Sequence, residues 1–260
     1  MKGSFFHLES DVTELFCNHG LDSVDALWNV SVRMIDEPNL GRGGHSNVGV
    51  LMLPTVEGNE EKKFFLKRQN NYNCRTLRHP FRGIPLAIRE WVSLQRLKEG
   101  GILTMDVACV GRDNTGGNDR AILVTHALEG YQPVGEWLSK ELPVDDRRYG
   151  MRAIGQLIGK MHGVGLMHGC LYSKHVFISK TFPHKIRFID LEKCTQIRSK
   201  NCGAKDIATF FRRTREVSID DREQLLESYM EANPFNWHIG ALQKNIADRI
   251  MAKKARKAAL

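Results

Sequence analysis

The first half of the chain carries short apolar stretches that predict a β-sheet interrupted by one helix. Apolar and polar residues alternate over 30–35, and 48–53 and 63–68 are short runs rich in aliphatic or aromatic residues. This length and composition are typical of strands. Over 86–99 the apolar residues recur at helical spacing instead, so we expect a helix there.

Two more strands are expected around 104–110 and 120–125, joined by a polar, glycine-rich turn over 111–119. After Gly130 the strand-like pattern gives way to helical periodicity. The expected helices are 134–140, 147–164, 206–215, 222–231 and 239–259.

The predicted fold class is α+β, in three parts. Residues 30–130 would form an antiparallel sheet with one helix, and residues 131–260 a mostly helical region. Residues 1–29 mix helical and loop signals, so we treat them as an N-terminal extension of unassigned structure.

Composition narrows the class of protein. The chain has 260 residues, 42% of them hydrophobic, and a net charge of +8. The charge favours an anionic partner, such as a nucleotide, a phosphorylated sugar, an acidic membrane or nucleic acid, although a basic surface can also serve solubility alone. The six cysteines form no CxxC pair, and the N-terminus has no signal-peptide core. No apolar run approaches the roughly 18 residues of a membrane span. We therefore expect a cytoplasmic protein with free thiols.

A glycine-rich segment lies between two predicted strands. It fits the pattern G-x-G-x-x-G-x-V, except that a serine replaces the third glycine of the pattern. Glycines let a backbone fold closely over phosphate groups and point its amides at them. Glycine-rich hairpins are common, so the segment gains weight only from its context. Its candidate residues are Gly41, Gly43, Gly44, Ser46 and Val48.

Charged and histidine residues follow that segment in a recognisable order. Lys67 lies in the strand 63–68, and Glu90 lies in the helix 86–99. His168 and His175 bound the segment His-Gly-Cys-Leu-Tyr-Ser-Lys-His, and Asp190 follows an apolar strand. A carboxylate that emerges from such a strand is costly unless it binds a metal ion or accepts hydrogen bonds.

This order resembles that of a protein kinase: a glycine-rich loop, a lysine, a helical glutamate, a histidine-led loop and an aspartate. The resemblance implies a two-lobed protein-kinase-like fold that binds ATP and Mg²⁺. The implied catalytic residues are His168, Lys67, Glu90 and the residue two positions after His168, which is Cys170. The implied ATP-binding residues are Gly41, Gly43, Gly44, Ser46, Val48 and Lys67, and the implied metal ligands are Asp190 and His175.

Two positions depart from the kinase pattern. Cys170 stands where kinases have the aspartate that takes or orients the acceptor proton, and His175 stands where they have a metal-binding asparagine. A thiol with an ordinary pKa near 8.5 is mostly protonated at neutral pH, and Mg²⁺ prefers oxygen ligands to imidazole. Phosphoryl transfer depends mainly on positioning and charge neutralisation. The sequence therefore fits either an enzyme with slowed transfer or a protein in which this loop no longer takes part in catalysis.

At a finer level the chain resembles the bacterial lipopolysaccharide kinases of the InaA/WaaP type, from about residue 30 to 215. That resemblance implies a phosphotransferase acting on a sugar hydroxyl of the lipopolysaccharide inner core, Kdo or heptose, or on a related envelope glycolipid. The segments that carry it are Gly41–Val48, Phe64–Gln69, Ile88–Glu90, His168–Ile178, Ile189–Leu191 and Lys205–Thr209.

Two alternative functions stay open. The first is a pseudokinase-like regulatory protein that binds nucleotide with little or no transfer, as Cys170 and His175 would favour. The second is a basic membrane- or nucleic-acid-binding protein without a nucleotide role, which the ordered motifs argue against; nucleic acid is not an expected partner.

Two basic segments have no assigned role. Residues 68–80 would either hold an acidic acceptor or form a solvated loop. The predicted helix 239–259 ends in basic residues; its apolar face would pack on the helical region, or the helix would contact an anionic membrane at the inner face of the inner membrane.

Overall fold

Contacts within the chain divide it into two units. Unit 1 comprises Met1–Val92 and Met105–Ala127, and unit 2 comprises Ser93–Thr104 and Leu128–Leu260. The computed structural model describes residues 3–35, 37–55, 60–76, 79–233, 235 and 237–258. The fold is mixed α+β, with an antiparallel N-terminal sheet and a helical C-terminal part, as the sequence predicts.

Unit 1 is built on one antiparallel sheet with the strand order β1-β8-β9-β5-β4-β2, to which β3 adds by pairing with β4. Side chains alternate between its faces; in β5, Phe64 and Leu66 are buried on one face, and Lys67 points to the other. The strands are β1 (Phe5–Leu8), β2 (Arg33–Met34), β3 (Asn39–Gly41), β4 (Gly44–Pro54), β5 (Glu61–Asn70), β8 (Val107–Thr115) and β9 (Asn118–His126).

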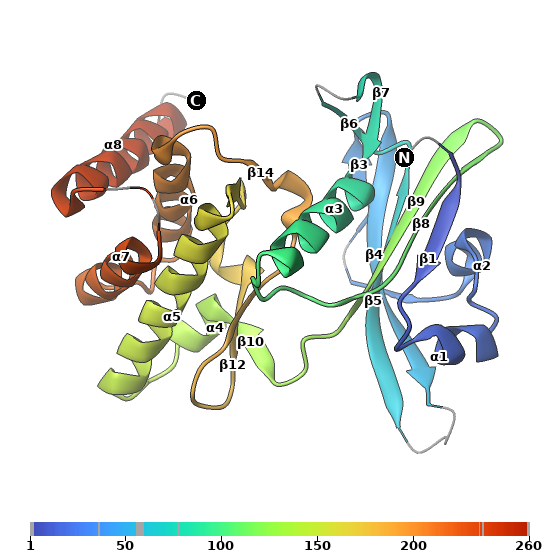
Figure 1. The fold of residues 1–260 in the computed structure, drawn as a ribbon, viewed down its shortest axis with the longest axis horizontal. Coiled ribbons are helices and arrows are strands. Elements are labelled where there is room, and N and C mark those ends of the chain that lie inside the picture. The colour runs from blue at the N-terminus through green and yellow to red at the C-terminus, as the bar shows by residue number, and fades with distance from the viewer. Residues whose placement is uncertain are drawn as a thin grey trace. The chain divides into compact units, whose positions relative to one another are not determined.

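The N-terminal extension completes the core of unit 1. Strand β1 pairs with β8, and helices α1 (Thr13–Asn18) and α2 (Val24–Asn29) lie beside one face of the sheet (Figure 1). Phe16 and Leu27 are fully buried there in one cluster with Phe64. Apolar positions that looked irregular in the sequence therefore pack against the sheet.

The predicted turn over 111–119 is much shorter in the structure. Strand β8 extends to Thr115 and β9 begins at Asn118, because Gly116 and Gly117 form the reversal with positive φ. The polar residues that suggested a loop pair across the two strands instead. The Arg112 Nε–Asp119 Oδ1 distance, for example, is 2.7 Å.

Two further elements bear on the site. Helix α3 (Leu86–Glu99) has the predicted bounds, and its buried residues Ile88 and Leu97 recur on one face. Strands β6 (Asn73–Thr76) and β7 (His79–Pro85), where no strand was predicted, pair with each other as a hairpin outside the main sheet.

Helices dominate unit 2. Helices α5 and α7 approach each other closely because Gly155 faces the backbone of α7: a Cβ at Gly155 would lie only 2.2 Å from the Leu225 carbonyl oxygen. No helix in the described part of the chain is long and apolar enough to span a bilayer. Besides the end of α3, the helices are α4 (Val134–Leu138), α5 (Val144–Gly163), α6 (Lys200–Arg213), α7 (Ile219–Ala232) and α8 (Ile239–Ala258).

Short strands in unit 2 frame the segments expected to carry the chemistry. Strand β11 (Leu166–Met167) pairs with β14 (Thr195–Gln196). The start of the histidine-led segment therefore lies beside the end of the segment that contains Asp190. The other strands form a sheet in the order β10 (Tyr131–Pro133), β12 (Val176–Ser179) and β13 (Ile186–Phe188).

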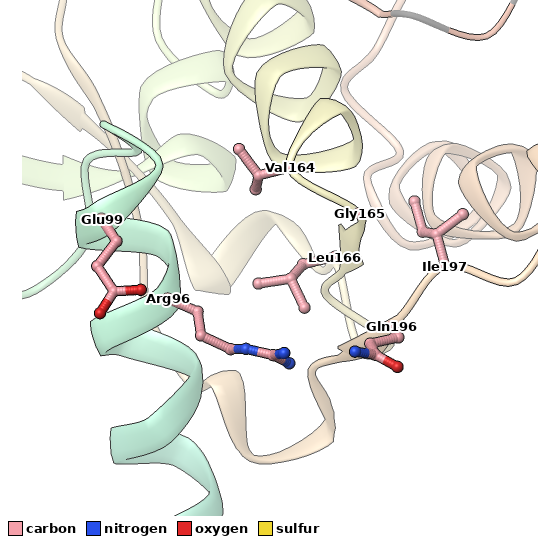
Figure 2. Close-up of a pocket in the computed structure, with 7 residues that line it drawn as sticks. All are labelled: Arg96, Glu99, Val164, Gly165, Leu166, Gln196 and Ile197. Carbon is pink, nitrogen blue, oxygen red and sulfur yellow. The ribbon is translucent and has the colours of Figure 1, made fainter.

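A pocket of about 420 Å³ opens beside the β11–β14 pair. Figure 2 shows Arg96, from the last turns of α3, directed toward Gln196, with Leu166 behind them. The lining residues are Arg96, Glu99, Val164, Gly165, Leu166, Gln196 and Ile197.

Candidate active site

The glycine-rich segment forms the tight hairpin between β3 and β4. Gly41 pairs with Gly44, and the two residues between them, Arg42 and Gly43, have φ values of 56° and 84°. Two-residue hairpins require this left-handed backbone. At Gly44 a Cβ would lie 1.9 Å from the Asn70 carbonyl oxygen, so only glycine allows the hairpin to run this close to the end of β5.

Ser46, the residue in place of the third glycine, is buried beneath the hairpin. Its Oγ accepts a hydrogen bond of 3.2 Å from Gln69 Nε2. Gln69 Oε1 in turn accepts a 2.6 Å hydrogen bond from the backbone N–H of Ala87, at the start of α3. Gln69 was not among the predicted site residues, although it lies two positions after Lys67 on the same face of β5. It ties β4, β5 and α3 together.

Lys67 and Glu90 form the ion pair that their positions predict. Lys67 Nζ lies 2.5 Å from Glu90 Oε2, and the side chains are 15% and 1% exposed. Val48 pairs with Lys67 in the register of β4 and β5, so the lysine lies beside the strand that follows the glycine hairpin. A carboxylate as buried as Glu90 is costly without such a partner.

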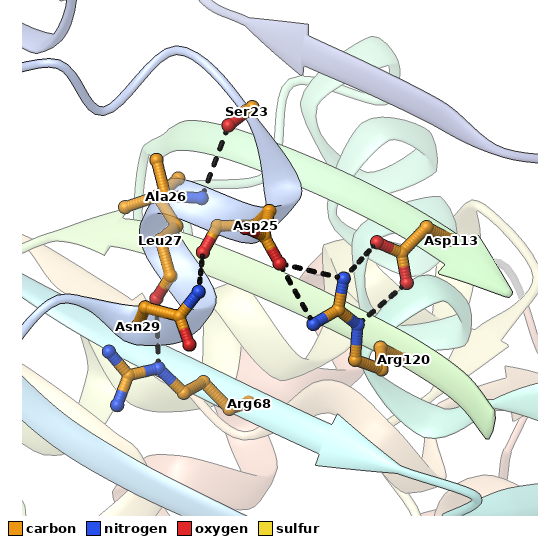
Figure 3. Close-up of polar contacts among 8 residues, drawn as sticks. All are labelled: Ser23, Asp25, Ala26, Leu27, Asn29, Arg68, Asp113 and Arg120. Atoms are coloured by element: carbon orange, nitrogen blue, oxygen red, sulfur yellow. Dashed lines mark hydrogen bonds and ion pairs between the residues drawn. The ribbon is translucent and has the colours of Figure 1, made fainter. Parts of the chain in front are cut away.

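The opposite face of β5 is fixed to α2, which holds Lys67's strand in place. Arg68 Nε donates a 2.9 Å hydrogen bond to the Leu27 carbonyl oxygen, as Figure 3 shows. Burial lowers the pKa of Arg68. Nearby, Arg120 of β9 contacts both Asp113 and Asp25 of α2, so the N-terminal extension is attached to the sheet by polar contacts as well as by its core.

In unit 2, His168 supports the segment that precedes Asp190. Its Nε2 donates a 3.0 Å hydrogen bond to the Ile189 carbonyl oxygen, and its ring stacks on that of His175 at 5.9 Å. Burial lowers the pKa of His168, so a neutral ring is favoured. Through these contacts His168 holds the backbone that precedes Asp190.

Asp206 of α6 fixes the backbone of the histidine-led segment. Its carboxylate accepts hydrogen bonds from the backbone N–H groups of His168, at 2.6 Å, and Gly169, at 2.9 Å. The carboxylate is almost fully buried. Sequence reasoning noted Asp206 only as part of a family segment and missed this function, because nothing in the local pattern shows that α6 passes beneath residues distant in sequence.

His175 and Asp190 lie together as two potential metal ligands. His175 Nδ1 is 2.9 Å from the Cys170 carbonyl oxygen, which can only accept, so Nδ1 carries the proton. His175 Nε2 is 3.2 Å from Asp190 Oδ2. Burial lowers the pKa of His175, whereas the charge of Asp190 raises it. At 3.2 Å, either a proton on Nε2 or a cation bound by both atoms would join this ring to the carboxylate.

The backbone at Asp190 is unusual. Its φ of 57° and ψ of 60° lie in the left-handed region, which few residues other than glycine adopt, although aspartate tolerates it. Such outliers concentrate at functional sites. This conformation places a carboxylate that is 39% exposed beside the buried ring of His175.

Cys170 is buried among groups that donate hydrogen bonds to its thiol. The hydrogen bond to Cys170 raises the pKa of Lys193, and the corresponding contact raises that of Tyr172. The guanidinium of Arg213 lies 5.3 Å from the centre of the Tyr172 ring. Cys170 is therefore set in a basic environment rather than in a purely apolar one.

The predicted site residues thus form two groups. Gly41, Gly43, Gly44, Ser46, Val48, Lys67 and Glu90 belong to unit 1, whereas His168, Cys170, His175 and Asp190 belong to unit 2. Within the described residues, no group of three or more histidine, cysteine, aspartate or glutamate side chains could hold a metal ion.

Comparison with known proteins gives consistent matches. The lipopolysaccharide kinase (Kdo/WaaP) family model matches residues 25–229. Protein InaA of Escherichia coli K12 is 27% identical over 217 residues, covering 82% of this chain and 90% of InaA. The lipopolysaccharide core heptose(I) kinase WaaP of Pseudomonas aeruginosa is 25% identical over 152 residues, covering 54% of this chain and 56% of WaaP.

Proposed function

The chain belongs to the lipopolysaccharide kinase (Kdo/WaaP) family, and from this membership we propose that it is an ATP-dependent phosphotransferase. Its acceptor would be a sugar hydroxyl of the lipopolysaccharide inner core, Kdo or heptose, or of a related envelope glycolipid. The observation that carries the proposal is the buried ion pair of Lys67 and Glu90, beside the strand that follows the glycine hairpin.

The proposal includes a two-lobed, protein-kinase-like arrangement. Residues 30–130 would be the N-lobe, residues 131–260 the C-lobe, and residues 1–29 an extension that completes the N-lobe sheet. The antiparallel sheet with α3, followed by helices α4 to α8, supports this division.

Three features of unit 1 would contribute to ATP binding. The backbone amides of the β3–β4 hairpin would contact the phosphates, since Gly41, Gly43 and Gly44 leave the backbone uncovered. Lys67, oriented by Glu90, would place its ammonium against the α- and β-phosphates. Gln69 would hold α3 against β5 and so keep Glu90 within reach of Lys67.

Asp190 and His175 fit a divalent cation, because Asp190 Oδ2 and His175 Nε2 lie 3.2 Å apart and both atoms can bind a cation. A bound Mg²⁺ would neutralise charge on the phosphates. Mg²⁺ usually binds through one or two protein carboxylates, with phosphate oxygens and water completing its shell, so two protein ligands suffice. His175 would also hold the loop through its hydrogen bond to Cys170.

The alternative function is a nucleotide-binding regulatory protein with little or no transfer activity. The observation that favours it is Cys170 in the position of the catalytic carboxylate. Both functions need Mg-ATP binding, so only a measurement of transfer separates them.

Lys67→Met is expected to lower ATP affinity or turnover by a factor of about 10–150, because a hydrogen bond to a charged group contributes about 1.5–3 kcal/mol. Affinity can be measured by calorimetry. The single variant leaves Glu90 buried without its partner, so Lys67→Met/Glu90→Gln is the better test of function in a stable protein. Lys62→Met, an exposed position of the same strand, serves as the control. Unchanged affinity and turnover in the double variant would remove Lys67 from the site.

Asp190→Asn is expected to abolish the extra thermal stabilisation that Mg²⁺ adds to ATP binding, since it removes the ligand's charge without changing its size. The measurement is the melting temperature with ATP in the presence of Mg²⁺ or EDTA. Asp145→Asn, at an exposed position in α5, should behave like the wild type. If the wild type gains the same stability from ATP with Mg²⁺ as with EDTA, the metal assignment is wrong.

A further inference from the structure

The β6–β7 hairpin of unit 1 is held to the rest of the unit at its base. Its base packs in a small core of Tyr72, Cys74 and Leu86. Asn73 Nδ2 donates a hydrogen bond of 3.2 Å to the carbonyl oxygen of Arg82, across the hairpin, and one of 2.9 Å to Asp119 Oδ2 of the main sheet. The described residues of the hairpin pair with no strand of the main sheet, and Figure 1 shows the hairpin next to β3.

Phe81 of β7 is 87% exposed, more than any other large apolar residue that the structure describes. A single exposed apolar residue needs no explanation by itself. Phe81 lies on a hairpin whose base is already packed, so its exposed ring adds little to the stability of the fold. The charges near it indicate what it could bind.

The segment of the chain that carries Phe81 is basic and contains no acidic residue. The chain has no aspartate or glutamate between Glu61 and Glu90. Arg75 and Arg82 are exposed on the hairpin, and neither guanidinium has a hydrogen-bond or ion-pair partner among the described residues. At the base of the hairpin, the guanidinium of Arg42 lies 5.8 Å from the centre of the Tyr72 ring.

We propose that the β6–β7 hairpin docks on an anionic phospholipid surface, with Phe81 at the lipid–water interface and Arg75 and Arg82 against lipid phosphates. Phenylalanine rings bury at the boundary between headgroups and acyl chains, and each basic residue near an anionic surface strengthens binding. A protein partner would need a wider apolar patch around its anchor, and small ligands bind in concave sites, whereas a bilayer accepts one projecting ring.

The C-terminal helix is the weaker candidate for this contact. The apolar residues Leu242 and Ile246 of α8 are buried, so most of its apolar face is occupied by packing. Beyond Ile250, the described part of the helix offers basic residues and one large exposed apolar side chain, Met251. The hairpin carries both features, a free aromatic ring and unpaired arginines.

The test is flotation of the full-length chain with vesicles of phosphatidylcholine alone or mixed with phosphatidylglycerol. We expect binding only to the anionic vesicles. Phe81→Ser should weaken it about tenfold, and Arg75→Gln/Arg82→Gln should weaken it roughly tenfold or more. Ile219→Ser, which removes a residue that is 77% exposed in unit 2, should bind like the wild type. Melting temperatures confirm that each variant is folded.

Three results would overturn the proposal. One is equal flotation with neutral and anionic vesicles. The second is loss of binding on deletion of residues 253–260 while the Phe81 and arginine variants bind normally, which would assign the contact to α8. The third is binding of single-stranded oligonucleotide through Phe81 without binding to vesicles. None of these measurements depends on phosphate transfer, so their outcome does not test the proposed kinase activity, which is tested separately.

Discussion

Replacing Cys170 by aspartate is expected to raise the turnover number for phosphate transfer. A carboxylate two residues after His168 can orient the acceptor hydroxyl and take its proton, and a positioned base contributes about 10²–10⁴-fold. The site can accommodate the new charge, because Lys193 and Tyr172 already donate toward this side chain. Turnover is measured at saturating ATP with core oligosaccharide as the acceptor.

Cys170→Ala is the matched control for that gain. If the thiol contributes to transfer, this variant will be slower than the wild type, and if Cys170 only fills space, the two will be equal. In either case Cys170→Asp should be the fastest of the three. If the wild type and Cys170→Asp both bind Mg-ATP but neither transfers phosphate, the regulatory function is favoured.

Asp206→Asn is expected to destabilise the protein by about 3–5 kcal/mol and to remove activity. The asparagine oxygen can accept from only one of the backbone N–H groups of His168 and Gly169, and the NH2 group lies against the other, so one buried donor that the carboxylate now satisfies is left unpaired. Such a loss is a large part of the 5–15 kcal/mol that stabilises a typical domain. Urea denaturation measures it directly.

Asp248→Asn, an exposed change on α8, controls for the loss of one negative charge. It should change the free energy of unfolding by less than about 0.5 kcal/mol. A fully stable and active Asp206→Asn protein would show that the loop does not depend on this carboxylate.

The sequence predicted elements best where periodicity was strong and long. Helix α3 was predicted with its observed bounds, because its apolar positions recur over four turns. The turn over 111–119 was mispredicted, since the charges of Arg112 and Asp119 serve a cross-strand pair that polarity alone cannot distinguish from a loop. The β6–β7 hairpin was missed because its strands are short and few of their residues are buried.

The site could be predicted where motif order carried the information. Lys67 and Glu90 were identified as partners from their places on a strand and the following helix, and the structure pairs them. Gln69 and Asp206 could not be found in this way, because their function is to hold backbone groups of other elements. Such contacts depend on packing between segments far apart in sequence, which no local pattern encodes.

The most direct measurement is the transfer of radiolabelled γ-phosphate from ATP to deacylated lipopolysaccharide core oligosaccharide by the wild-type protein with Mg²⁺. We predict that label appears on the sugar and that Lys67→Met/Glu90→Gln lowers the rate of labelling by a factor of about 10–150. The assignment as a sugar kinase would be contradicted if the wild type and the Cys170→Asp variant both bind Mg-ATP and both leave the oligosaccharide unlabelled.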